Sequence, residues 1–112
     1  MATAETEGKW LAALDLGARA QFLASLSHEL TIAGRDSYVV QGVGLTKPEL
    51  LRGINEIQHR VSACLAQLLS GAADASFERS MMNSVLKSSN DELRAHGVTA
   101  WKRAKERLNR AN

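Results

Sequence analysis

The sequence of 112 residues is short of the residue types that mark several common classes of small protein. Its single cysteine, Cys64, excludes an internal disulfide and a zinc site built from several cysteines. Its single proline, Pro48, leaves long stretches of the chain free to form helices. No apolar run approaches the roughly 18–20 residues that a helix needs to cross a bilayer. We therefore expect neither a disulfide-rich domain, nor a cysteine zinc site, nor a membrane-spanning protein.

The composition that remains indicates a globular chain. Apolar residues make up 45% of it and charged residues 23%, a balance typical of folded rather than disordered proteins. The length predicts a single helical domain over residues 1–112, in which the polar, acidic residues 1–8 form a disordered tail. Because this segment lacks the basic and apolar regions of a secretory signal, we expect a cytoplasmic protein.

The clearest helix signal begins at Thr46. Thr46-Lys-Pro-Glu49 is a capping box, and Pro48 falls in the first turn, where no amide hydrogen is needed. Apolar residues then recur every three or four positions and predict one buried stripe, formed by Leu50, Ile54, Ile57, Val61, Cys64 and Leu68. Gly71 is expected to end this long helix.

Similar capping residues predict three further helices. They are the segment 16–38 capped by Asp15, the segment from Asp74 to about Lys87, and the segment from the capping box Ser89–Glu92 to about Asn109. Residues 9–14 predict one helical turn. The β-branched and glycine-containing residues 38–45 predict an extended connection.

These helices predict an all-α fold. We expect a four-helix bundle with two long antiparallel helices and two shorter C-terminal helices. The mismatch in helix length leaves apolar area that one chain does not cover. A homodimer would bury it, and we predict one.

The pair Glu56 and His59 has the Glu-x-x-His spacing of di-iron helical bundles. On a helical projection both residues lie off the apolar stripe, and neither His28 nor His96 follows a glutamate at the same spacing. A metal-binding bundle centred on Glu56 and His59 is therefore an alternative, and a polar contact on the helix surface is the preferred interpretation.

No other motif predicts catalysis. The segment Gly42–Lys47 lacks the Gly-Lys-Ser/Thr order of a phosphate-binding loop. His28, near two serines, is expected to point to solvent, and Cys64 on the apolar stripe is expected to behave as an inert hydrophobic residue. We therefore expect no enzyme and no cofactor.

The second long helix also carries a polar set that supplies donors, acceptors and an imidazole. Its members are Asn55, Glu56, His59 and Arg60. An ordinary solvated face is one interpretation, and a protein interface is the other. Arg60 borders the apolar stripe, so its guanidinium is expected to pair with Glu29 or Asp36 on the first long helix.

The end of the chain is basic. Against Glu106 it has five basic residues, Lys102, Arg103, Lys105, Arg107 and Arg110. Basic residues in a last turn complement the helix macrodipole, and a nucleic-acid patch is the alternative. Trp101 and Arg103 are further candidates for a partner contact.

Two stretches of the long helices can be considered together, Leu30-Thr-Ile-Ala-Gly-Arg-Asp36 and Leu51-Arg-Gly-Ile-Asn-Glu-Ile-Gln-His-Arg-Val61. They resemble a group of small all-helical bacterial proteins of unassigned function. The resemblance covers roughly residues 16–70. It implies no substrate, cofactor or catalytic residue.

Exclusion and geometry together favour a non-enzymatic small helical regulator. We expect it to bind another protein through an apolar helix face, for example as an antagonist of a transcription regulator. One alternative is a nucleic-acid-binding protein that uses the basic C-terminal helix. The other is the metal-binding bundle centred on Glu56 and His59.

Overall fold

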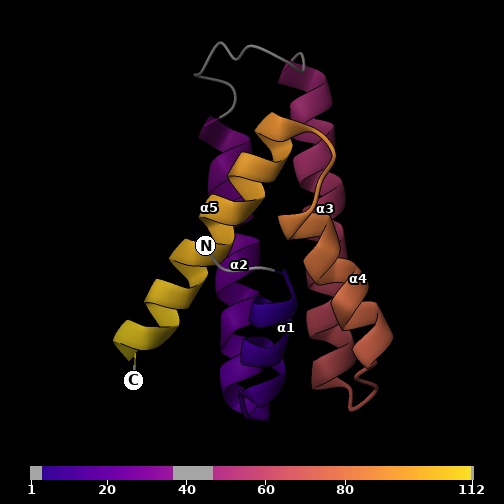
Figure 1. The fold of residues 1–112 in the computed structure, drawn as a ribbon, viewed down its shortest axis with the longest axis vertical. Helices are drawn as coiled ribbons and strands as arrows, with labels where there is room; N and C mark the ends of the chain where they lie inside the picture. Colours follow the sequence, from indigo (N-terminus) through magenta and orange to yellow (C-terminus); the bar gives the residue numbers. More distant parts are fainter. Residues whose placement is uncertain (1–3, 37–46, 112) are drawn as a thin grey trace.

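The computed structural model describes residues 4–36 and 47–111, and its regular structure there is entirely helical. Its five helices are α1 (Ala4–Ala13), α2 (Leu16–Asp36), α3 (Lys47–Leu69), α4 (Ala75–Leu86) and α5 (Asp91–Ala111) (Figure 1). The predicted all-α class is confirmed. Within the described residues, no helix is both long enough and apolar enough to cross a membrane.

The structure has one helix more than the sequence predicted. Where one turn was expected over residues 9–14, α1 runs from Ala4 to Ala13. It therefore includes residues 4–8 of the predicted tail, while residues 1–3 lie outside the described residues. Glu7 and Leu11 are buried on α1, so contacts with distant parts of the chain stabilise a helix that has little helical signal of its own.

The helices are arranged around α2. It has its most extensive contacts with α3 and α5, and α4 packs against both of these helices (Figure 1). Helix α5 has 21 residues, the same as α2, so only α4, with 12, is a short C-terminal helix. The expected length mismatch is therefore smaller than the sequence suggested, and α1 packs on α4.

Most of the predicted helix ends are confirmed. The Asp15 carboxylate accepts from the Ala18 amide at 2.8 Å, and Asp74 accepts from the amides of Ser76 and Phe77. Gly71, with φ of 78°, follows α3 and takes the left-handed conformation that a side chain would strain.

Other helix ends differ or are not described. Asn90, one residue later than the expected Ser89, caps α5 by accepting from the Leu93 amide at 3.0 Å. Asparagine is as good a cap as serine, so the pattern alone did not decide between them. Thr46 and the extended connection predicted over residues 38–45 lie outside the described residues.

The predicted stripes form the core. All six stripe residues of α3 are buried, as are Phe22, Leu23, Leu26 and Leu30 of α2. Phe22 and Trp101 pack edge to face with 4.8 Å between ring centroids, and Trp10 packs on both rings. A Cβ at Gly97 would lie 2.0 Å from the Val85 carbonyl oxygen, so this glycine permits the close approach of α4 and α5.

Candidate functional site

The apolar faces of the helices are mostly used inside the molecule. Among the described residues, the large apolar side chains that are exposed are Leu16 and Leu69. Trp101, a predicted partner contact, is 1% exposed and lies between Phe22 and Trp10 in the core. The structure therefore places Trp101 in the core and not on the surface.

The polar set predicted on α3 does lie on the surface. Asn55, Glu56, His59 and Arg60 are all exposed. They line a shallow hollow on α3, which we call the α3 hollow, together with Pro48, Leu51 and Arg52. All four residues therefore line the same hollow.

A second hollow adjoins the first, because Glu56 and Arg60 line both. It is an open groove of about 580 Å³ between α3 and α4, which we call the α3–α4 groove. Its lining consists of Gly53, Glu56, Ile57, Arg60, Ser76, Arg79, Ser80, Asn83, Ser84, Lys87, Ser88, Ser89 and Leu93. Hydroxyl and basic side chains dominate this lining, so the groove is suited to hydrogen-bond acceptors and anions.

Helix α4 supplies more of the groove lining than any other helix, because its sequence divides into two sides. Met81, Met82 and Val85 are buried, which turns the opposite side of the helix outward. Ser76, Ser80 and Ser84 repeat every four residues and so lie along one side of the helix. This spacing was visible in the sequence, but its meaning depends on α3 lying beside it.

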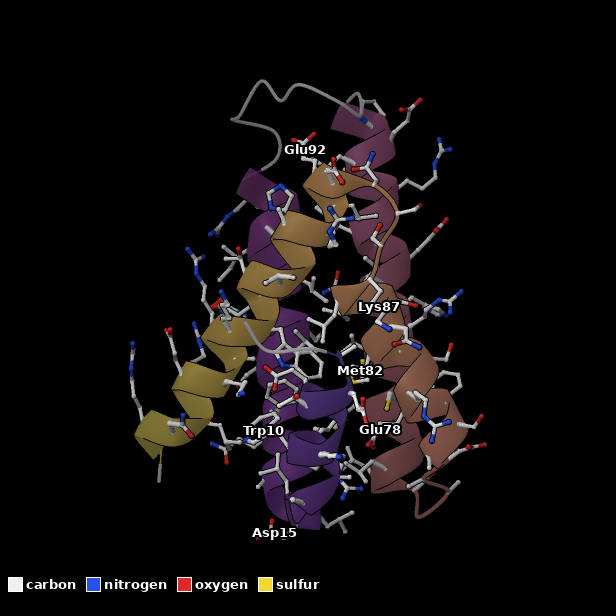
Figure 2. The ribbon with its side chains drawn as sticks, in the orientation of Figure 1. Trp10, Asp15, Glu78, Met82, Lys87 and Glu92 are labelled. Atoms are coloured by element: carbon white, nitrogen blue, oxygen red, sulfur yellow. The ribbon has the colours of Figure 1, made fainter. Side chains whose placement is uncertain are left out.

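Basic side chains in the groove have no acidic partner. Arg60, Arg79 and Lys87 form no ion pair with any described residue, and Arg60 Nη1 is 3.5 Å from the Ser80 hydroxyl oxygen. Glu56 is the one acidic residue in the described lining. Lys87 lies near the end of α4 (Figure 2). The groove therefore has an excess of positive charge.

Two basic side chains outside the groove pair with carboxylates of other helices. Lys105 Nζ lies 2.9 Å from a Glu7 carboxylate oxygen. Arg19 Nη1 lies 3.8 Å from a Glu78 carboxylate oxygen, in a pair whose side chains are both largely buried. These pairs join α5 to α1 and α2 to α4, so they are part of the fold rather than of an open site.

The predicted ion pair between Arg60 and Glu29 is not formed. The Glu29 carboxylate is buried and lies 3.5 Å from Nε of Arg107, because its position on α2 faces α5 rather than α3. Arg60 instead lies beside Ser80 on α4. The side chain of Asp36, the other predicted partner, lies outside the described residues.

Arg103 is exposed, but it lies apart from the α3–α4 groove. It lines a small hollow of α5 with Glu29, Glu106, Arg107 and Arg110. Among the basic residues of this segment, Lys105, Arg107 and Arg110 pair with Glu7, Glu29 and Glu106, respectively. Much of the basic end is thus balanced by nearby carboxylates.

The chemistry-bearing residues outside the groove are separated. No group of three or more His, Cys, Asp or Glu side chains arranged to hold a metal occurs in the part of the chain that the structure describes. Cys64 is buried, and burial, with a further contribution from Glu78, raises the pKa of its thiol to about 11. The thiol is therefore protonated at neutral pH, as expected for a core cysteine.

Comparisons with known proteins add no relative. No protein-family model, curated protein or solved structure matches the chain. The α3 hollow and the α3–α4 groove, together called the α3–α4 surface, are therefore the features from which a function is argued.

Proposed function

We propose that this chain is a non-enzymatic helical regulator that binds another protein through the α3–α4 surface. The observation that supports it best is the excess positive charge of the groove, where Arg60, Arg79 and Lys87 have no ion pair with a described residue. Arginine is enriched in protein interfaces, and complementary charge guides partners into register. A surface with unpaired positive charge attracts a negatively charged partner most strongly.

The contact we propose is polar rather than apolar. The stripes that suggested an apolar docking face are buried in the core, whereas the α3–α4 groove is lined mainly by hydroxyl and basic side chains. The target we propose is a surface of a transcription regulator that the chain would mask. A homodimer remains a second proposal for the same surface, and the experiment below separates the two.

The test is site-directed photo-crosslinking in the native cell. A photoreactive amino acid would replace His59 in the α3 hollow or Ser76 in the α3–α4 groove, both of which are exposed. The matched control places it at Ala24, an exposed residue of α2 that lines neither hollow. We expect the two surface positions to form an adduct with the same second protein, and the Ala24 position to form none.

Two results would overturn the proposal. Adducts of the same size from all three positions would mean that the surface has no preference. Adducts that contain only two copies of this chain would assign the surface to a homodimer. Circular dichroism of each purified variant confirms that its helices are intact before the adducts are compared.

A further inference from the structure

We infer that the partner segment in the α3–α4 groove is an acidic helix with carboxylates on two of its turns. This inference rests on the proposed function, because it names the chemistry of the partner that the surface would bind. It is carried by the shape of the groove, by the positions of its basic side chains along α4, and by the one acidic side chain that faces them from α3.

The α3–α4 groove is elongated and lies between two helices. Its α4 lining runs from Ser76 to Lys87, which at a rise of 1.5 Å per residue is roughly 17 Å, or about three helical turns. It is open to solvent along this length. A helix of similar length fits along such a groove, because side chains three and four residues apart form one row on its surface.

The basic side chains are spread along the length of the α3–α4 groove. Arg79 of α4 and Lys87, which caps the end of that helix, are eight residues apart, a rise of about 12 Å. Arg60 of α3 lies beside Ser80, at the same level as Arg79. One small anion does not reach both ends of this arrangement, whereas carboxylates about seven residues apart on a helix lie at a matching spacing.

Glu56 places a negative charge in the middle of the α3–α4 groove. Helices α3 and α4 run in opposite directions (Figure 1). Glu56, four residues before Arg60 on α3, therefore lies one turn from it toward the Lys87 end of the groove. A carboxylate there would be repelled, so the complementary partner has an acidic, then basic, then acidic order along its contact face. The position between the two carboxylates therefore distinguishes this partner from a uniformly acidic segment.

The same charge order disfavours a nucleic-acid backbone, which presents negative charge at every level of the groove. No aromatic side chain is present in the described lining to stack on a base. The arginine side chains suit carboxylates well, because a guanidinium can bind both carboxylate oxygens. Arg60 retains most of its donors, since its single described bond, to Ser80, is long.

The experiment uses the full chain and a synthetic helix of about three turns, fixed by a hydrocarbon staple on its outer face. The probe peptide carries two glutamates about seven residues apart with a lysine midway. One matched peptide has glutamines in place of the glutamates, and a second has a glutamate in place of the lysine. Binding is measured by anisotropy of a dye on the peptide and located by amide chemical-shift changes in the protein.

We expect the probe peptide to bind at least about tenfold more tightly than either matched peptide, and to weaken as salt is raised. Arg79→Glu with Lys87→Glu should abolish this preference, and a peptide with lysines in place of the glutamates should restore binding to that double variant. The matched control is Lys102→Glu with Arg103→Glu on α5, which should leave binding unchanged. Shift changes should centre on Arg60, Arg79 and Lys87.

Equal binding of the probe and glutamine peptides would overturn the inference, as would shift changes on α5. Tighter binding of a mixed-sequence DNA duplex to the same residues would assign the groove to nucleic acid instead. If the peptides fail while His59 and Ser76 still crosslink to one protein, the partner chemistry is wrong and the proposed function survives. If the probe peptide binds as described but no second protein crosslinks, the groove does prefer the acidic helix and the proposed function fails.

Discussion

The Lys105 ammonium lies 2.9 Å and 3.2 Å from the two oxygens of the Glu7 carboxylate, across 98 residues of sequence. The same ammonium lies 4.5 Å from the centroid of the Trp10 ring. Glu7 is buried, so its charge is compensated mainly by this one cation. One side chain of α5 therefore holds α1 in place by an ion pair and by a cation–π contact.

Lys105→Met should destabilise the fold by about 2–3 kcal/mol, because it leaves a buried carboxylate without its cation. Urea unfolding followed by circular dichroism measures the change in the free energy of unfolding. Glu7→Gln combined with Lys105→Met should cost less than the sum of the two single changes. Lys9→Met, which removes the exposed pair with Glu5, should change stability by less than about 0.5 kcal/mol; an equal loss in the two methionine variants would contradict this account.

Gly97→Ala should cost about 3 kcal/mol, because the added Cβ would lie 2.0 Å from the Val85 carbonyl oxygen and push α4 away from α5. Gly17→Ala is the matched control. Its Cβ would meet nothing closer than 3.6 Å, so this change should be neutral or stabilise α2 by up to about 1 kcal/mol. Thermal unfolding of both variants makes the comparison, and a stable Gly97→Ala variant would show that the two helices have room to separate.

Arg19→Met should loosen the junction of α1, α2 and α4. The guanidinium donates to the carbonyl oxygens of Ala12 and Leu14 at 3.0 Å each, and it pairs with Glu78. We expect the free energy of unfolding to fall by about 1–3 kcal/mol. Amide hydrogen exchange should become faster in α1 by more than it does in α3. Arg19→Lys should recover only part of the loss, since one ammonium does not reproduce the planar fork of donors. Unchanged exchange in α1 would argue against this role.

Cys64 should make the fold less stable in alkali. Its thiol pKa is raised from 9.0 to about 11, so the unfolded chain loses its thiol proton first as the pH rises. The contribution is fully present below pH 9 and is lost between pH 9 and pH 11, with a size on the order of 2 kcal/mol. The measurement is the difference between the pH profiles of the natural chain and Cys64→Ala. Parallel profiles over that range would contradict the prediction.

Local patterns located α2, α3, α4 and α5 along the chain, because helix formation there depends on residues three and four positions apart. The α3 stripe from Leu50 to Leu68 is buried throughout, and Asp15 and Asp74 cap the helices that they were expected to cap. The first half of α1 was missed because its stability depends on Lys105, whose position relative to Glu7 cannot be seen in a short stretch of sequence.

The sequence alone predicted only part of the candidate site. Helical projection correctly placed Asn55, Glu56, His59 and Arg60 on the exposed side of α3. It did not identify Arg79 and Lys87, because these face the same groove only once α4 lies against α3. The mistaken pairing of Arg60 with Glu29 has the same origin, since a projection says which way a side chain points and not which helix is next to it.

The two tryptophans share one aromatic cluster, and this decides what intrinsic fluorescence can report. Trp10 and Trp101 have ring centroids 6.5 Å apart, and neither lines the α3–α4 surface. Native emission therefore follows the docking of α1 and is blind to a ligand bound between α3 and α4. Any assay of that ligand needs a reporter of its own, while detachment of the first helix is visible without one.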